Sequence, residues 1–328
     1  MKQGGCMLYS DPGQDISTAV KQTQQMPIYL FAGQSNMQGN VDPILFQDLL
    51  RILDANKKPK DKINGLEKRL NNWYLYANNG YARYAYSPAV SAMEAQRMLE
   101  MKKQGLITAT FPNPPKNNVA FCTCTDQVAK PMTDNCGNPF GPELLFSRKI
   151  AKETHKPFTV VKVVEGGTSL AHDWISPSAA NGNPGPMYIK LTDRITSLKQ
   201  APDTIHAHCK LSGDACKFKA FVWFQGETDC FDKSSADAYS SNLEHFIADV
   251  RTALGDPNFP VIIVQVGYWP KTLPFGPIVM QAQADFVNKT PNTALVTTVD
   301  LSQFFHFDPA AQLIIGERIA NSVSKLAP

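Results

Sequence analysis

Five short runs of apolar residues alternate with segments of helical periodicity along the chain. The runs contain few polar residues, which is typical of strands covered on both faces in a parallel sheet. They are 28–31, 158–164, 219–224, 260–266 and 294–299. Apolar residues recur at helical spacing in 42–55, 142–154, 188–198 and 239–254, after Pro277 and after Pro309. Alternating strands and helices favour right-handed crossovers, and so the sequence predicts an α/β fold, a three-layer α/β/α sandwich around a central five-stranded parallel sheet.

Two segments lack this periodicity. Residues 1–25 are polar and glycine-bearing, and we expect a flexible N-terminal tail there. Residues 26–328 are predicted to form one domain with a long insertion at about 56–140, which contains many tyrosines, asparagines and prolines. The simplest interpretation of the insertion is a set of surface loops packed by their own aromatic rings. The alternative is that some of these rings form a sugar-binding wall, because long ordered loops often carry function.

The charge pattern excludes some classes of partner. The chain has 328 residues and a net charge of only +3, with no long basic run between aromatic residues, so nucleic acid is not expected. No apolar run approaches the length of a membrane span. Residues 1–25 also lack the apolar core of a secretory signal, so the protein is either cytoplasmic or has lost a leader.

The seven cysteines favour the second possibility. Cys209 and Cys216 bracket a short loop that a disulfide could close, and three others cluster in a Pro- and Asn-rich stretch, namely Cys122, Cys124 and Cys136. Cysteines clustered in loops favour an oxidising compartment, and we expect a secreted or periplasmic protein. A zinc site that combines this cluster with His206 or His208 is less favoured, because the spacing matches no common zinc pattern. We expect Cys6 to be the unpaired thiol.

The first apolar run ends in a small loop that presents Ser35. If the run is a parallel strand, the loop opens at the carboxyl edge of the sheet, where ligands bind in doubly wound folds. A lone serine in a loop is usually a turn or cap residue, so a nucleophilic role needs partners elsewhere in the chain.

The loop sequence Ala32–Met37, AGQSNM, resembles the nucleophile block of the SGNH-type hydrolases, in the carbohydrate acetylesterase and sialate O-acetylesterase branch. Further blocks follow in the order of that family: GPEL at 141–144, EGGTSL at 165–170, WFQGETD at 223–229, and His306 ahead of GER at 316–318. The resemblance implies a flavodoxin-like SGNH hydrolase fold. It also implies a serine esterase that removes O-acetyl groups from a glycan, such as acetylxylan or a sialate, without metal or organic cofactor.

The resemblance also implies roles for single residues. Ser35 would be the nucleophile and His306 the base that activates it, because a serine hydroxyl is a weak nucleophile at neutral pH. The oxyanion hole would consist of the backbone N–H groups of Ser35 and Gly167 and the side-chain amide of Gln225. We prefer Gly167 to Gly166. His172 is a second candidate for the base, and Gln225 could instead be an ordinary polar residue at a strand end.

Three further residues of these blocks are expected to contact the substrate: Gln34, Asn36 and Thr168.

The sequence departs from the family at the position of the triad acid. The family carries an acidic residue two or three positions before the histidine, and here those positions are Phe304 and Gln303. Either Gln303 orients the ring of His306, or a carboxylate comes from elsewhere, or catalysis is lost. The candidate carboxylates are Glu227, Asp300 and Asp308, of which we prefer Glu227.

The interpretation of Glu227 as a buried partner that holds the Ser35 loop is about equally good. Loss of the acid would leave a catalytically weak or inactive glycan-binding protein on the same scaffold. A third hypothesis is an SGNH esterase for other acyl esters.

Overall fold

The fold is seen in a computed structural model, which describes residues 7–9, 27–39, 96–97, 99–101, 103–104, 122–124, 141–154, 158–200, 217–267, 272–301, 306–307 and 309–327. The five apolar runs form the parallel strands β2 (Pro27–Gly33), β4 (Phe158–Val164), β5 (Lys217–Phe224), β6 (Val261–Val264) and β7 (Thr293–Val296). The predicted helix over 42–55 and the aromatic residues of 73–86 lie outside the described residues.

The parallel strands lie in the order β4-β2-β5-β6-β7. This is the flavodoxin-like order, with the first strand of the chain between the second and third. The predicted fold is therefore confirmed. The strand order reverses at β2, which pairs with β4 on one side and with β5 on the other. The loops after these three strands meet at the carboxyl edge, where this class of sheet binds ligands.

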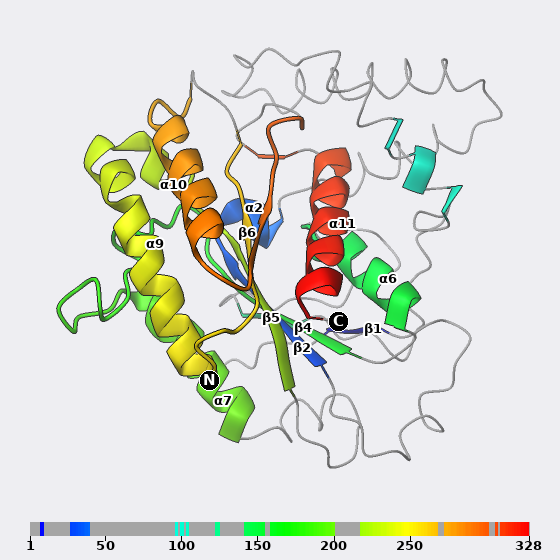
Figure 1. The fold of residues 1–328 in the computed structure, drawn as a ribbon, viewed down its shortest axis with the longest axis horizontal. Coiled ribbons are helices and arrows are strands. Elements are labelled where there is room, and N and C mark those ends of the chain that lie inside the picture. Colours follow the sequence, from blue (N-terminus) through cyan, green and yellow to red (C-terminus); the bar gives the residue numbers. More distant parts are fainter. Residues whose placement is uncertain are drawn as a thin grey trace.

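Helices cover both faces of the sheet (Figure 1). On one face lie α7 (Pro186–Gln200), α9 (Lys233–Leu254) and α10 (Gly276–Lys289), and on the other lie α6 (Glu143–Thr154) and α11 (Pro309–Leu326). The short elements α2 (Ser35–Gln38) and η1 (Asp229–Phe231) follow β2 and β5 directly. The predicted helices in these regions are confirmed.

Two additional strands extend the sheet at β4. Strand β1 (Met7–Tyr9) is antiparallel to the first half of β4, and β3 (Cys122–Cys124) is parallel to its second half. The polar segment 1–25 is therefore not a flexible tail over its whole length, because three of its residues pair with the open edge of β4. Strand β3 likewise places two cysteines of the insertion on the sheet rather than in a loop.

Large aromatic side chains fill the two layers between the sheet and its helices. On the α7 and α9 side, the ring centroids of Trp223 and Phe246 are 4.4 Å apart, and Trp174 meets Trp223 edge-on at 5.0 Å. On the α6 side, Phe31 meets Phe146 at 4.9 Å. Rings of this size bury much apolar area and fix how the helices sit on the sheet.

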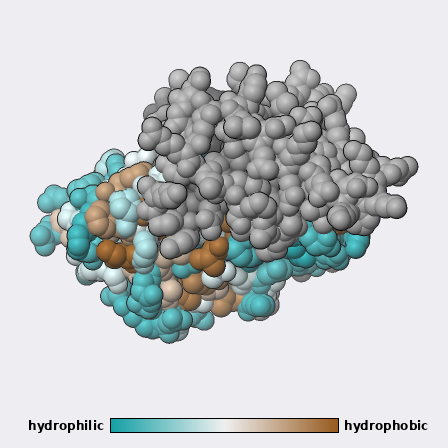
Figure 2. Space-filling model, turned by 90° about the horizontal axis from the view of Figure 1, so that it is seen from above, coloured by the Kyte–Doolittle hydropathy of each residue, from teal (hydrophilic) through white to brown (hydrophobic). Residues whose placement is uncertain are grey.

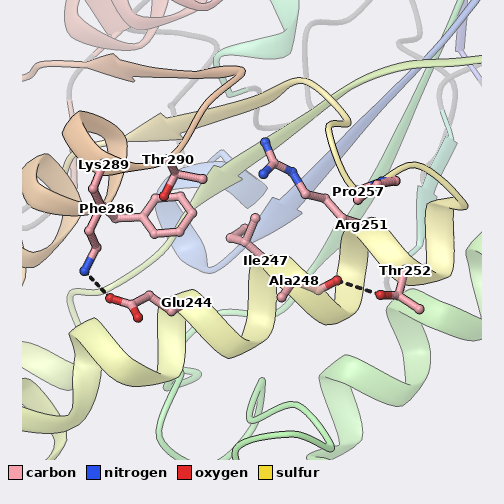
Figure 3. A pocket seen from close by; sticks show the side chains of 9 residues that line it. All are labelled: Glu244, Ile247, Ala248, Arg251, Thr252, Pro257, Phe286, Lys289 and Thr290. Carbon is pink, nitrogen blue, oxygen red and sulfur yellow. Dashed lines mark hydrogen bonds and ion pairs between the residues drawn. The ribbon is translucent and has the colours of Figure 1, made fainter.

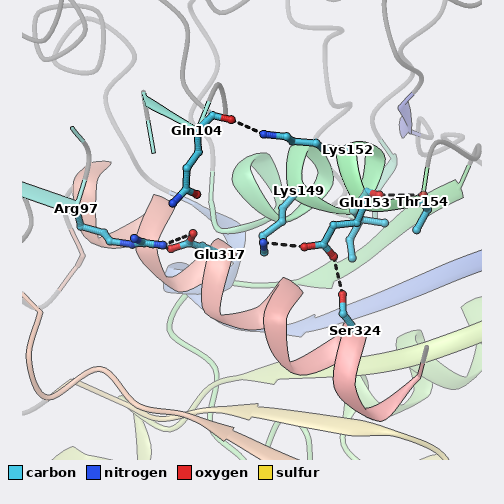
Figure 4. A network of polar contacts seen from close by, with 9 residues as sticks. Arg97, Gln104, Lys149, Lys152, Glu153, Thr154, Glu317 and Ser324 are labelled. Carbon is cyan, nitrogen blue, oxygen red and sulfur yellow. Dashed lines mark hydrogen bonds and ion pairs between the residues drawn. The ribbon is translucent and has the colours of Figure 1, made fainter. Parts of the chain in front are cut away.

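The insertion contacts helices α6 and α11 (Figure 4). The Nε of Arg97 donates to Glu317 Oε2 on α11 at 2.9 Å, and Lys152 on α6 donates to the backbone oxygen of Gln104. The two helices are themselves linked, because Ser324 donates to Glu153 Oε2 at 2.7 Å. These contacts attach residues 97 and 104 to the main domain.

The described part shows both hydrophilic and hydrophobic residues on the face seen in Figure 2. In the view of Figure 2, hydrophilic residues cover much of its outer rim and hydrophobic areas lie between them. Its exposed large hydrophobic side chains are Ile189, Phe231, Ile278 and Val299. Of the helices described, none has the length and apolar character needed to cross a membrane.

Candidate active site

Ser35 is held at the carboxyl end of β2 by a tight connection to β5. Gln34 N–H donates to the backbone oxygen of Phe224 at 3.2 Å, and the chain then turns into α2, where Gly39 N–H donates to Ser35 O at 2.9 Å. The turn needs glycine at position 33, because a Cβ there would lie 2.0 Å from Phe224 O. A strand end and a one-turn helix therefore fix the Ser35 hydroxyl from both sides.

His306 meets this hydroxyl from the other end of the chain. Its Nε2 lies 3.0 Å from Ser35 Oγ, within hydrogen-bond distance. The ring is half-buried, and burial lowers the pKa of His306 below its ordinary value. The imidazole is therefore neutral at neutral pH, the form that can accept a proton from the serine.

Two other histidines, His172 and His245, are exposed. His245 lies on α9 with its Nδ1 2.8 Å from Ser241 O, and His172 follows the Gly166–Gly167 loop. The remaining histidines, at 155, 206 and 208, lie outside the described residues. The structure thus brings His306 to the serine and gives no contact of this kind to His172.

The candidate acids occupy different places. Glu227 is buried, and its Oε1 accepts a hydrogen bond of 2.6 Å from Asn36 Nδ2. Asp300 pairs with Arg318, whose Nη1 donates to Asp300 Oδ1 at 2.7 Å, so this carboxylate is engaged elsewhere. Gln303 and Asp308 lie outside the described residues. Glu227 therefore contacts the Ser35 loop, which was the alternative interpretation of this residue.

Burial controls the protonation of Glu227. Its pKa is raised to about 7, chiefly by desolvation and also by the neighbouring Asp229, while the hydrogen bond from Asn36 lowers it. Glu227 therefore changes charge near neutral pH, which an exposed glutamate does not do.

Gln225 faces the protein interior. Its side chain is fully buried, and Nε2 donates to Asp229 Oδ2 at 2.6 Å and to the Thr168 backbone oxygen at 2.9 Å, with the Gln34 amide 3.2 Å away. An amide nitrogen carries two hydrogens, and these acceptors use both. The prediction that Gln225 donates to the oxyanion is therefore wrong for this structure. Gln225 instead holds the loop after β4 against the loop after β5.

Asp229 completes this link and was missed as a site residue. Its carboxylate accepts from the backbone N–H groups of Leu170 at 2.9 Å and Ala171 at 3.0 Å, in addition to Gln225. Burial raises the pKa of Asp229, and these hydrogen bonds oppose that shift. The sequence feature that could have identified Asp229 as a site residue is its position in the WFQGETD block, four residues after Gln225.

The loop that Asp229 and Gln225 hold passes over Ser35. Gly166 lies against the serine, since a Cβ on Gly166 would be 3.7 Å from Ser35 Cβ. Gly167 is exposed with φ +73°, and a Cβ there would meet nothing within 4 Å. Donation by Gly167 N–H to an oxyanion stays a prediction.

The three residues expected to contact substrate are buried. Gln34 and Asn36 are each 1% exposed, and Thr168 is 6% exposed. The Thr168 hydroxyl donates to Glu165 O and accepts from Trp174 Nε1, both at 2.8 Å. These side chains position the loops around Ser35, and direct contact with substrate stays a prediction.

The cysteine predictions are tested only in part. Cys230, which follows Asp229, is a buried free thiol whose Sγ lies 3.0 Å from Gly226 O, and burial raises its pKa. Four of the other cysteines lie outside the described residues, namely Cys6, Cys136, Cys209 and Cys216. The disulfide expected between Cys209 and Cys216 therefore stays a prediction.

Within the described residues, no group of three or more His, Cys, Asp or Glu side chains could hold a metal ion.

Relatives with solved structures share the fold. A protein of Arabidopsis thaliana superposes with a TM-score of 0.53 at 16% identity, covering 92% of this chain and 99% of that one. A carbohydrate acetylesterase from Xanthomonas citri gives 0.51 at 17% identity, covering 92% and 56%. NanS gives 0.50 at 14% identity, covering 93% and 98%.

Sequence comparison identifies the family. A probable carbohydrate esterase of Arabidopsis thaliana is 30% identical over 113 residues, which are 32% of this chain and only 40% of that relative. The family described as carbohydrate esterase, sialic acid-specific acetylesterase matches residues 117–325, a range that includes His306 and the 223–229 block but begins after Ser35. The resemblance drawn from the sequence is confirmed, and the chain belongs to this carbohydrate esterase family.

Proposed function

We propose that the chain hydrolyses O-acetyl esters of a carbohydrate, with Ser35 as nucleophile and His306 as general base. The observation that carries this proposal is the 3.0 Å contact between His306 Nε2 and Ser35 Oγ. Membership of the esterase family supports the ester as substrate class.

The reaction follows from these two groups. His306 Nε2 takes the proton of the Ser35 hydroxyl as Oγ attacks the acetyl carbonyl carbon, which forms a tetrahedral oxyanion. His306 then returns the proton to the sugar oxygen, which leaves as an alcohol. Water, activated by the same ring, attacks the acetyl-serine and releases acetate, regenerating the hydroxyl.

The oxyanion would be stabilised by backbone N–H groups at the mouth of the site. Ser35 N–H and Gly167 N–H are the proposed donors. Because the amide of Gln225 is used internally, the hole depends on backbone groups, whose positions the buried side chains of Gln225 and Asp229 maintain. Loss of one such donor typically costs about 100- to 1,000-fold in turnover.

Turnover of p-nitrophenyl acetate tests the nucleophile and base. Wild type should be active, and both Ser35→Ala and His306→Ala should lose at least about 1,000-fold in kcat, because members of such a pair act as a unit. Equal rates in wild type and Ser35→Ala would overturn the assignment.

Acetate release from natural esters tests the substrate class. Acetylated xylan and O-acetyl sialate are compared with an octanoyl ester of p-nitrophenol. Release of acetate from an acetylated glycan supports the proposal. Preference for the octanoyl ester, or glycan binding without acetate release, would replace it with one of the other hypotheses.

A further inference from the structure

Asn36 connects α2 to the loop after β5 and to the segment at the start of α11, through its side chain and backbone. Its Nδ2 donates to Glu227 Oε1 at 2.6 Å, its Oδ1 accepts from Phe307 N–H at 3.1 Å, and its backbone oxygen accepts from Gln312 Nε2 at 3.1 Å. Glu227 follows β5, whereas Phe307 and Gln312 lie just before and within α11. Each of these three partners therefore belongs to a segment distant from Asn36 in sequence.

The orientation of the Asn36 amide follows from its partners. A backbone N–H can only donate, so the atom facing Phe307 must be the amide oxygen. The amide nitrogen then faces Glu227, whose Oε1 accepts from it. Glu227 and Phe307 thus fix opposite ends of the same amide.

This amide lies directly beside the catalytic pair. Ser35 lies within hydrogen-bond distance of His306, and Asn36 accepts a hydrogen bond from Phe307. Two consecutive residues of one segment therefore contact two consecutive residues of the other. The Phe307 ring is buried and lies 5.9 Å from the Phe224 ring at the end of β5. A hydrogen bond to Asn36 and a ring contact with Phe224 therefore help to hold the backbone next to the imidazole.

We propose that Asn36 is a positioning residue for the reaction, and that Glu227 acts through it, by holding the amide that keeps the Ser35 and His306 segments in register. The proposal rests on the proposed function of the Ser35–His306 pair. It assigns Glu227 to the orientation of Asn36 rather than to direct contact with the imidazole.

Asn36→Ala tests whether the Asn36 amide positions the Ser35 and His306 segments. The variant removes the hydrogen bond between Asn36 Oδ1 and Phe307 N–H and lets the two segments shift. Because a displacement of about 1 Å can cost roughly 100-fold in rate, we expect kcat for p-nitrophenyl acetate to fall about 30- to 100-fold while KM changes less than about threefold. A purely structural role would lower the folded fraction and leave kcat per folded molecule unchanged, and that result would overturn the proposal.

Arg251→Met is the matched control for lost stability. Arg251, which Figure 3 shows on α9, is buried at the opposite, amino-terminal edge of the sheet. Its Nε donates to Phe259 O at 3.0 Å and its Nη2 donates to Pro291 O at 2.9 Å. It lines a cavity of about 490 Å³ between α9 and α10 and has no part in the site. This variant should unfold at lower urea concentration with unchanged kcat.

A double-mutant cycle separates the action of Glu227 through Asn36 from direct action on His306. Glu227→Gln keeps an oxygen that can accept from Asn36, so it should lose less than about threefold in kcat, whereas Glu227→Leu should resemble Asn36→Ala. In the Asn36→Ala background, Glu227→Leu should cost less than about twofold more, because residues acting through one contact are not additive. If the losses of kcat in the two single variants multiply in the double variant, or if Glu227→Gln alone loses 100-fold in kcat, Glu227 acts directly on His306. Either result would overturn the proposal.

Labelling of Ser35 by a fluorophosphonate distinguishes failure of this proposal from failure of the proposed function. Labelling needs the activated serine but no carbohydrate. A wild type that is labelled, together with Asn36→Ala that is labelled about 30-fold more slowly, supports the proposal. Equal labelling rates would overturn the positioning role alone. A wild type that is neither labelled nor active would overturn both.

Discussion

Lys162 and Glu143 form an ion pair of 2.8 Å beneath the helix that begins with Ser35. Lys162 projects from the middle of β4 and is 2% exposed, and its Nζ also donates to the Gln38 backbone oxygen at 3.0 Å. Glu143 Oε1 accepts from Gly141 N–H at 3.1 Å. The pair therefore connects the end of α2 to the sheet and to α6.

Replacement of Lys162 by methionine should destabilise the fold. Burial lowers the pKa of Lys162 and the pairing with Glu143 raises it, so the charge is held by its partner. Removing the cation leaves Glu143 buried without a counter-charge, which typically costs about 3 to 5 kcal/mol. Urea denaturation of Lys162→Met against wild type measures this loss as a lower midpoint with an unchanged slope.

The double variant Lys162→Met/Glu143→Leu is its control. Removal of both charges avoids the uncompensated carboxylate, so the double variant should recover at least about half of the stability lost in the single one. If single and double variants unfold at the same urea concentration, the ion pair does not set the stability of this region.

Gly33→Ala should disrupt the junction between β2 and β5. A Cβ on Gly33 would lie 2.0 Å from Phe224 O and 2.7 Å from Phe224 C, both backbone atoms that cannot move without breaking the sheet. We expect a loss of at least about 3 kcal/mol, because overpacking against backbone is among the most costly substitutions. The free energy of unfolding in urea measures it. Gly182→Ala is the matched control.

Gly182 has a positive φ of +88°, but a Cβ there would lie within 4 Å of no atom outside Gly182 and its two chain neighbours. It should therefore show only the strain of a left-handed alanine, roughly 1 kcal/mol. Equal losses in both variants would mean that the close approach at Phe224 contributes nothing.

The sheet was predictable from sequence because it is buried on both faces. Continuous apolar runs such as 158–164 and 219–224 identify central parallel strands, and the alternation with helices fixes the order of crossovers. The same topology predicted that Ser35 and His306 meet, since loops after parallel strands share one edge. The short edge strands β1 and β3 carry no such pattern and depend on the open edge of β4.

The direction of buried polar side chains could not be predicted. Gln225 lies at the end of β5 beside Gln34, yet its amide points inward because Asp229 and Thr168 O offer acceptors there. Asn36 likewise stands next to Ser35 in sequence but faces Glu227 and Phe307. Such directions depend on partners that come from other strands, so local sequence does not reveal them.

The activity should depend on pH through His306. Burial lowers the pKa of the imidazole, and only its neutral form accepts the serine proton, so kcat/KM should rise with pH and level off with a midpoint below about 6.5. Because Glu227 also titrates near neutrality, the profile is measured in both wild type and Glu227→Gln. A midpoint above 7 in Glu227→Gln would contradict the effect of burial on this ring.

Stability should fall as pH rises through the titration of Glu227. Its pKa is about 7 in the folded chain, against an ordinary value of 4.5, so the fold favours the protonated carboxyl. This contribution is fully present below pH 4.5 and is lost as pH rises through about 7. A shift of this size corresponds to roughly 3 kcal/mol of unfolding free energy.

Glu227→Gln isolates this contribution, because the amide does not titrate. Groups that do not couple to Glu227 titrate alike in both proteins and cancel, so the difference between wild type and variant reports Glu227 together with its coupling to Asp229. Relative to the variant, wild type should lose roughly 3 kcal/mol of unfolding free energy between about pH 4.5 and 8.5, measured by urea denaturation. A constant difference across this range would show that Glu227 has the same pKa in the folded and unfolded chain, and that its burial beneath Asn36 does not control its charge.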